Sequence, residues 1–276
     1  MMRSMYSAIS GLKAHQVMLD VVSNDIANVN TVGYKGSRTS FKDSLTQLQQ
    51  GATAPSGNQG GTNASQVGLG VQLGSIDNVM NSGAFQPTGN VTDVAIQGDG
   101  WFRVAAGAPP AVPTAFQYTR AGNFTFNAAG YLITQEGYYV IGHDAPGGAG
   151  ADTYIIVPPG STDVAIGADG EVSYVDSTGT RQTAGYLTLA TFPNEAGLMR
   201  VSGNRWVESA ASGTPNVSTP GTNGFGSTIS GTLEMSNVDL ATEFTEMISA
   251  QRGFQANSRA ISVADDLLQE LVNLKR

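Results

Sequence analysis

Apolar residues recur every seven positions near both ends of the chain, and no proline interrupts either run. The N-terminal repeat predicts a helix over residues 4–29, and the C-terminal repeat predicts one over about 237–273. The repeating residues are Met5, Leu12, Leu19 and Ile26 at the first end, and Leu233, Leu240, Met247, Phe254, Ile261 and Leu268 at the second. For the C-terminal helix, Ser236 or Asn237 is suited to cap the first turn.

A sustained seven-residue repeat requires a partner helix, because the apolar stripe stays on one face only when helices wind around each other. The companion positions are often polar, which would weaken an isolated two-helix seam. They are Gln16 and Ser23 in the first repeat, and Gln251, Ser258 and Asp265 in the second. Two interpretations stay open: a helical hairpin packed on a globular core, or helices that each meet several neighbours, including other subunits.

The middle of the chain has the alternating pattern of β-strands. Residues 92–104 (TDVAIQGDGWFRV) and 162–175 (TDVAIGADGEVSYV) are near-copies, each with an Asp-Gly turn. Residues 116–134 predict two strands joined by Asn-Ala-Ala-Gly, and 184–192 and 203–209 predict further strands. Two stretches rich in Gly, Ser, Thr, Asn and Pro are typical of linkers; they are residues 51–65 and 211–227.

These patterns predict an α+β protein in which the terminal α-helices form a coiled-coil stem and extended flexible arms lead to a central all-β domain. We assign residues 1–30 and 233–276 to the stem, and residues 31–74 and 211–232 to the arms. The β domain is expected over residues 75–210.

Composition narrows the possible partners. The 276 residues carry a formal net charge of −8, which argues against nucleic acid, because a nucleic-acid binder needs a basic face. There is no cysteine, so disulfides and thiolate metal sites are excluded. We expect no membrane partner, because no window holds the roughly 18 apolar residues of a membrane span. The N-terminus also lacks the apolar run of a cleaved signal peptide.

Candidate chemistry is sparse. The two histidines, His15 and His143, do not supply a metal-ligand pattern, and no nucleophile motif occurs, so we expect no enzyme, metal or cofactor. Trp101 and Trp206 are predicted to belong to the β core. Two other function classes stay open: a carbohydrate-binding or adhesive β domain, which exposed tryptophans would favour, and a hydrolase, which would need a cleft with paired carboxylates.

The two ends carry the most specific motifs. Residues 7–43, including Asn24, Ile26-Ala27-Asn28 and Gly33-Tyr34-Lys35, and residues 233–276, including Ser236-Asn237-Val238-Asp239, resemble the terminal signatures of the bacterial flagellar axial proteins. Asp25 stands where the usual motif has a second asparagine. In the middle, "YTRAGNF" is similar to the β domain of the same family.

The resemblance implies a structural subunit that assembles into a helical tube, with its terminal helices lining an export channel. Among axial proteins we expect the short hook protein, a flexible universal joint that transmits motor torque, with the distal rod protein as the alternative. The implied partners are further copies of the chain, adjoining rod, hook-cap and hook–filament junction proteins, and the flagellar export apparatus. The implied location is extracellular, in the flagellum, after export without a cleaved signal.

The resemblance and the heptads together give a set of expected subunit-interface residues. They are Met5, Leu12, Leu19, Asn24, Ile26, Asn28, Asn30, Tyr34, Asn237, Leu240, Met247, Gln251, Phe254, Asn257, Ile261 and Leu268.

Overall fold

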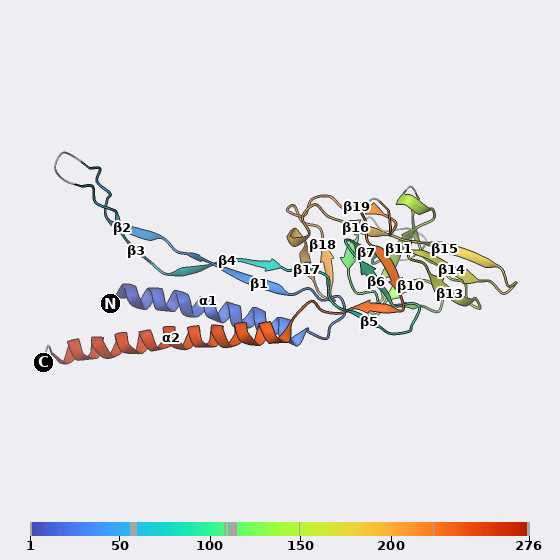
Figure 1. Cartoon of the computed structure of the whole chain (residues 1–276). Helices are drawn as coiled ribbons and strands as arrows, with labels where there is room; N and C mark the ends of the chain where they lie inside the picture. The colour runs from blue at the N-terminus through green and yellow to red at the C-terminus, as the bar shows by residue number, and fades with distance from the viewer. Residues whose placement is uncertain are drawn as a thin grey trace. The chain divides into compact units, whose positions relative to one another are not determined.

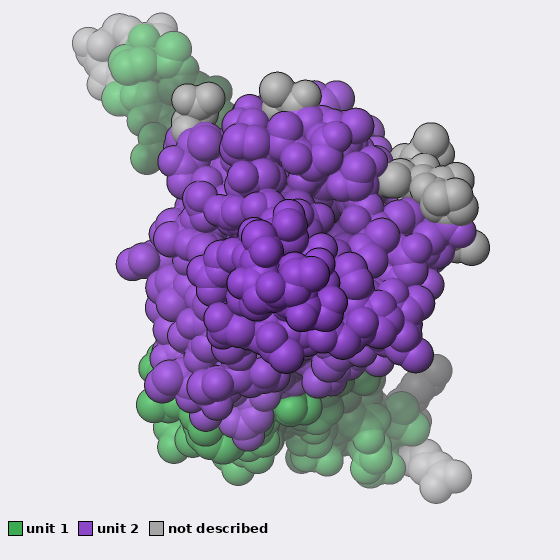
Figure 2. Space-filling view, turned by 90° about the vertical axis from the view of Figure 1, so that its right-hand side faces the viewer, with its two compact units in different colours: residues 1–27, 37–78, 239–276 green, residues 28–36, 79–238 purple. Residues whose placement is uncertain are grey.

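The computed structural model describes residues 2–55, 60–107, 109, 115–148, 150–222 and 224–274. The chain forms two compact units, each assembled from segments that are distant in the sequence. Unit 1 comprises residues 1–27, 37–78 and 239–276, and unit 2 comprises residues 28–36 and 79–238 (Figures 1 and 2).

Unit 1 contains the two long helices, α1 (Met2–Ala27) and α2 (Leu240–Asn273), which pack side by side in antiparallel directions (Figure 1). Both predicted helices exist, but α1 ends two residues earlier and α2 begins three residues later than expected. Asp239, not Ser236 or Asn237, caps α2: its carboxylate accepts a hydrogen bond from the Ala241 N–H at 3.1 Å. The coiled-coil stem stays a prediction.

The remainder of unit 1 is a long β-hairpin in the segment predicted to be a flexible arm. Its proximal part pairs β1 (Ser37–Asp43) with β4 (Val71–Asn78), and a bulge interrupts the ladder after Ser40. Its distal part pairs β2 (Thr46–Gln50) with β3 (Ser65–Gly68). The expected arm over residues 31–74 therefore contains paired strands, and residues 31–36 belong to unit 2. Residues 56–59 of the predicted linker lie outside the described residues.

Unit 2 is built on an antiparallel sheet of thirteen strands, which follows the order β13-β14-β15-β11-β7-β8-β18-β17 with branches. The strands on this path are β7 (Trp101–Ala105), β8 (Gln117–Thr119), β11 (Tyr139–His143), β13 (Thr162–Ile166), β14 (Glu171–Val175), β15 (Arg181–Leu187), β17 (Met199–Val201) and β18 (Arg205–Val207). The branches are β9 (Phe124–Phe126), β10 (Leu132–Thr134), β12 (Asp152–Tyr154), β16 (Leu189–Thr191) and β19 (Asn216–Ser218). Two 3-10 turns accompany them, η1 (Pro146–Gly148) and η2 (Glu195–Gly197).

Two smaller strand pairs complete unit 2 and bring its C-terminal segment back to its beginning. β20 (Ser227–Ser230) pairs with β6 (Val94–Gln97), and β21 (Thr232–Glu234) pairs with β5 (Phe85–Pro87). Residues 211–232, predicted as the second arm, thus hold strands of the folded β unit, which extends to residue 238.

The core of unit 2 confirms the prediction for the two tryptophans. Trp101 and Trp206 are fully buried and meet edge to face, with ring centroids 5.7 Å apart. The alternative of a carbohydrate-binding face required an exposed tryptophan for stacking, and the burial of both removes that support. A larger cluster of buried apolar side chains, which includes Phe102, Phe124 and Leu132, forms another part of the core of unit 2.

The two near-copies in the sequence fold differently. In the second copy, β13 and β14 form a hairpin around Asp169-Gly170, as predicted. In the first copy, β6 pairs with β20, whereas β7 pairs with β8, β11 and β16. The Asp99-Gly100 turn therefore connects strands that do not pair with each other.

Candidate assembly surfaces and the buried ionic cluster

At two positions in the seam between α1 and α2, a glycine of one helix lies against a large side chain of the other. A Cβ on Gly11 would lie 2.6 Å from the Asn257 side chain, and a Cβ on Gly253 would lie 2.5 Å from the His15 ring. This reciprocal arrangement fixes an antiparallel register. The other fully buried side chains of the helices are also mostly small: Ala8, Ala14, Val22, Ala250 and Ala264.

Several large apolar side chains on unit 1 are exposed. Leu240, Phe244 and Ile248 follow one another at four-residue spacing on α2, with exposed fractions of 41%, 50% and 50%. Val263 and Leu267 form a second exposed pair farther along α2. Such contiguous apolar surface is typical of an interaction site. No helix among the described residues is sufficiently long and apolar to cross a membrane.

The expected interface residues on the two helices fall into an exposed group and a partly buried group. Leu240, Gln251 and Asn24 are exposed, and the others are partly buried within the chain. The partly covered residues are Met5, Leu12, Leu19, Ile26, Met247, Phe254, Asn257, Ile261 and Leu268.

The carboxyl groups of Asp25 and Glu243 lie near each other close to the start of α2. Asp25 is almost fully buried, and its carboxylate accepts a hydrogen bond from the Ser37 N–H at 2.9 Å. Burial raises the pKa of Glu243 to about 7, and the negative charges of Asp25, Glu246 and Asp239 contribute to the same shift. The aspartate that departs from the usual family motif thus lies in an acidic environment.

Unit 2 contains a buried ionic cluster that joins the N-terminal and C-terminal motifs. The Lys35 ammonium lies 2.7 Å from Glu234 Oε1, and Arg120 Nη1 lies 3.3 Å from Glu234 Oε2. All three side chains are essentially inaccessible to solvent. Burial lowers the pKa of Lys35, and Glu234 partly offsets this effect. Removing one partner from such a cluster leaves an uncompensated buried charge, which is costly.

Tyr34 and Gly33, which precede Lys35, are also fixed by contacts within unit 2. Tyr34 is buried, and the Arg200 guanidinium lies 4.7 Å from its ring centroid and donates to its hydroxyl at 3.1 Å. Arg200 also donates to the Lys35 carbonyl. Gly33 has φ +64°, and a Cβ there would lie 2.5 Å from the backbone nitrogen of Ala121, so only glycine fits.

Two expected interface residues therefore have roles inside unit 2. Tyr34 is covered by its own chain, and its place at a subunit interface stays a prediction. The Asn237 amide donates to the Val79 and Asn81 carbonyls and accepts from the Gly36 N–H, so most of its hydrogen-bonding capacity is used within the chain. Asn28 accepts from the Thr31 hydroxyl, whereas Asn30 is exposed.

Sequence reasoning missed Glu234 and Arg120, although both lie inside the quoted motifs. The signal in the sequence that could have indicated the cluster is the isolation of a charged residue. Arg120 is the only charged residue between Arg103 and Glu136, and such an isolated charge is buried only when it is paired.

Family comparisons match the same segments. The model described as "Flagella basal body rod protein" matches residues 5–35, the "Flagellar hook protein FlgE/F/G D1 domain" matches 95–174, and the "Flagellar basal body rod FlgEFG protein C-terminal" matches 229–274. The flagellar basal-body rod protein FlgG of Bacillus subtilis is 48% identical over the full length of both chains. This chain belongs to the flagellar rod and hook protein family.

A rod protein and a hook protein of one organism, Borreliella burgdorferi, differ in their similarity to this chain. Its basal-body rod protein FlgG is 34% identical to this chain over the full length of both. Its hook protein FlgE is 27% identical, over an alignment of 447 positions that also covers both chains fully. That hook protein thus carries many residues that have no counterpart in this chain. Members of the family are structural components of the flagellum.

Proposed function

We propose that this chain is the distal rod subunit of the flagellar basal body, and that it polymerises into a stiff helical tube through unit 1. The observation that carries the self-assembly is the exposed apolar surface formed by Leu240, Phe244 and Ile248 on α2. Burying such a surface against further copies is favourable by about 25 cal/mol per Å² of apolar area removed from water.

The rod is preferred to the hook because of the relatives. The sequence alone favoured the short hook protein, but the rod proteins are more similar and match this chain end to end without a large insertion. This comparison supports the alternative over the original expectation.

The hairpin also supports assembly. Every residue of β2 and β3 is exposed, and an isolated two-stranded hairpin is marginally stable in water. We propose that neighbouring subunits cover it, together with the exposed or partly covered helix residues of the interface set. Asn24, Asn28 and Asn30 would contribute amide hydrogen bonds at these contacts.

The remaining partners follow from the position of a distal rod. The tube would join other rod subunits at one end and hook subunits at the other. Its location would be the flagellar basal body, reached through the flagellar export apparatus.

Polymerisation of the purified full chain tests the proposal. We expect tubes above a critical concentration, and we expect Phe244→Ser/Ile248→Ser to raise that concentration strongly. Ser249→Ala, at an exposed polar position of the same helix, is the matched control and should have little effect. A wild-type chain that stays monomeric at every concentration would refute self-assembly.

Electron microscopy of a strain that lacks this gene separates the two members of the family. Loss of the distal rod predicts a truncated rod, whereas complete rods without hooks would restore the hook interpretation.

A further inference from the structure

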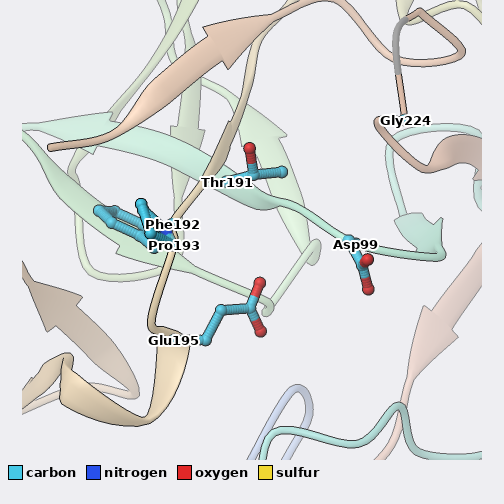
Figure 3. Close-up of a pocket in the computed structure, with 6 residues that line it drawn as sticks. All are labelled: Asp99, Thr191, Phe192, Pro193, Glu195 and Gly224. Atoms are coloured by element: carbon cyan, nitrogen blue, oxygen red, sulfur yellow. The ribbon is translucent and has the colours of Figure 1, made fainter. Parts of the chain in front are cut away.

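A hollow on unit 2 combines two carboxylates with an apolar wall. It has a volume of about 420 Å³ and is lined by Asp99, Thr191, Phe192, Pro193, Glu195 and Gly224. The carboxylates of Asp99 and Glu195 point into the same space, and Phe192 and Pro193 lie to one side of it (Figure 3). Such a hollow fits a cation carried on an aliphatic or planar stem.

The two carboxylates of the hollow have no ion-pair partner among the described residues. Lys35 and Arg120 are shared by Glu234, which contacts both, and by Glu195, which feels both at longer range. Both buried cations are therefore already paired with Glu234, and neither Asp99 nor Glu195 forms an ion pair with a described residue. Burial raises the pKa of Glu195 despite those cations, so its ionised form would gain from one more positive charge.

The cations that could supply this charge are distributed unevenly over the molecule. In unit 2, Arg181 is the one exposed basic residue among the described residues, and it is paired with Asp163. In unit 1, the described basic residues are all exposed, and none forms an ion pair with another described residue. They are Arg3, Lys13, Arg38, Lys42, Arg252 and Arg259.

We propose that the Asp99–Glu195 hollow receives a basic side chain from unit 1 of a neighbouring copy in the polymer. This inference rests on the proposed self-assembly and adds a specific contact to it. The excess negative charge attracts the incoming group, and Phe192 and Pro193 contact its stem. The contact would set the stagger between copies, because one charged side chain entering one hollow fixes relative position.

The first test is the critical concentration of the full chain at low and high ionic strength. Asp99→Asn/Glu195→Gln should raise it about tenfold at low ionic strength, the change that corresponds to about 1.4 kcal/mol. The effect should shrink in high salt, which screens charge. Asp169→Asn/Glu208→Gln, which removes two carboxylates outside the hollow, should leave the critical concentration unchanged.

The second test uses the absence of cysteine from the chain. Subunits with Asp99→Cys are mixed with subunits that carry one of Arg3→Cys, Lys13→Cys, Arg38→Cys, Lys42→Cys, Arg252→Cys or Arg259→Cys. The polymers are treated with a short bifunctional thiol-reactive reagent, because a long basic side chain holds the two Cβ atoms farther apart than a disulfide spans. A crosslinked dimer from one of these pairs supports the contact and identifies the donor.

The outcomes separate the two proposals. If wild-type chain polymerises, but the Asp99/Glu195 variant has an unaltered critical concentration or no pair crosslinks, the contact is refuted and self-assembly stands. If wild-type chain never polymerises, the proposed function itself fails. Tryptophan fluorescence, which reports on the buried Trp101 and Trp206, verifies that each variant is folded.

Discussion

The two units of this chain differ in how far they bury their own apolar and charged side chains. Unit 2 buries its tryptophans, its larger apolar cluster and the ionic cluster of Lys35, Arg120 and Glu234 within one subunit. Unit 1 leaves large apolar residues exposed on α2 and on both strands of its hairpin, and the buried apolar residues of its helices are mostly alanine. This difference is what the proposed assembly requires: unit 2 is self-sufficient, whereas unit 1 would be completed by other copies of the chain.

The largest expected effect concerns the self-sufficiency of unit 2. Glu234→Leu would leave the buried Lys35 and Arg120 without their shared carboxylate, and we expect unit 2 to lose about 3–5 kcal/mol of stability. The measurement is urea unfolding followed by tryptophan fluorescence. Arg181→Ala, which breaks an exposed pair with Asp163, should cost less than about 1 kcal/mol.

The triple variant Lys35→Met/Arg120→Met/Glu234→Leu sharpens the same prediction. Because it removes every charge of the ionic cluster, it should be more stable than Glu234→Leu alone. Equal stability of the two would show that packing, and not uncompensated charge, causes the loss.

A glycine substitution tests how closely the N-terminal motif fits unit 2. Gly33→Ala would place a Cβ against the backbone of Arg120 and Ala121, at φ +64°. Gly221 has a similar φ of +74° but open space around it, so Gly221→Ala should cost only the left-handed strain of about 1–2 kcal/mol. Gly33→Ala should cost clearly more in the same urea assay. Equal costs would mean that the close approach is not needed.

The sequence predicted the elements that follow a regular pattern. The heptads located α1 and α2 within three residues, and the Asn-Ala-Ala-Gly turn gave the β9–β10 hairpin with Phe126 opposite Leu132. The hairpin of unit 1 escaped prediction because its strands are mainly polar and exposed, so they show no alternation. Residues 211–232 escaped because they pack through hydroxyl groups, such as the fully buried Ser212, which donates to the Ser209 carbonyl.

The candidate site was predicted only in part, for a physical reason. Heptad positions can be recognised locally, because they repeat along one helix. In the buried ionic cluster, Arg120 and Glu234 are 114 residues apart and Lys35 and Glu234 are 199 residues apart. No local pattern indicates which distant charges will meet. The contact of Tyr34 with Arg200, which lies 166 residues away, is hidden from a local pattern for the same reason.

An intermediate effect is expected in the helix seam of unit 1. Replacing a helical glycine with alanine normally stabilises a helix by about 1 kcal/mol. At Gly253 the new Cβ would meet the His15 ring at 2.5 Å, so we expect Gly253→Ala to lose that gain and lower the melting temperature of the assembled helices, measured by circular dichroism. In a His15→Ala background the same change should be stabilising. A gain in both backgrounds would contradict the seam.

The smallest effect is a pH dependence at the start of α2. Because the folded pKa of Glu243 is raised to about 7 from an ordinary 4.5, its carboxylate is disfavoured in the folded helix pair. The stability linked to Glu243 should thus be fully present below about pH 4.5 and decline as the pH rises through 7. Glu243 is only partly buried, so the loss should stay below about 1 kcal/mol after solvent screening.

Glu243→Gln should flatten this part of the pH profile of the helix melting temperature. Asp25→Asn, which restores the amide of the usual family motif, should flatten it less, because burial is the larger cause of the shift. Glu270→Gln, at an exposed position on α2, should leave the profile as in the wild type. A wild-type profile that rises between pH 5 and 8 would contradict the assignment. It would mean that the carboxyl group gains a favourable partner on folding and that unit 1, like unit 2, satisfies its charges within one chain.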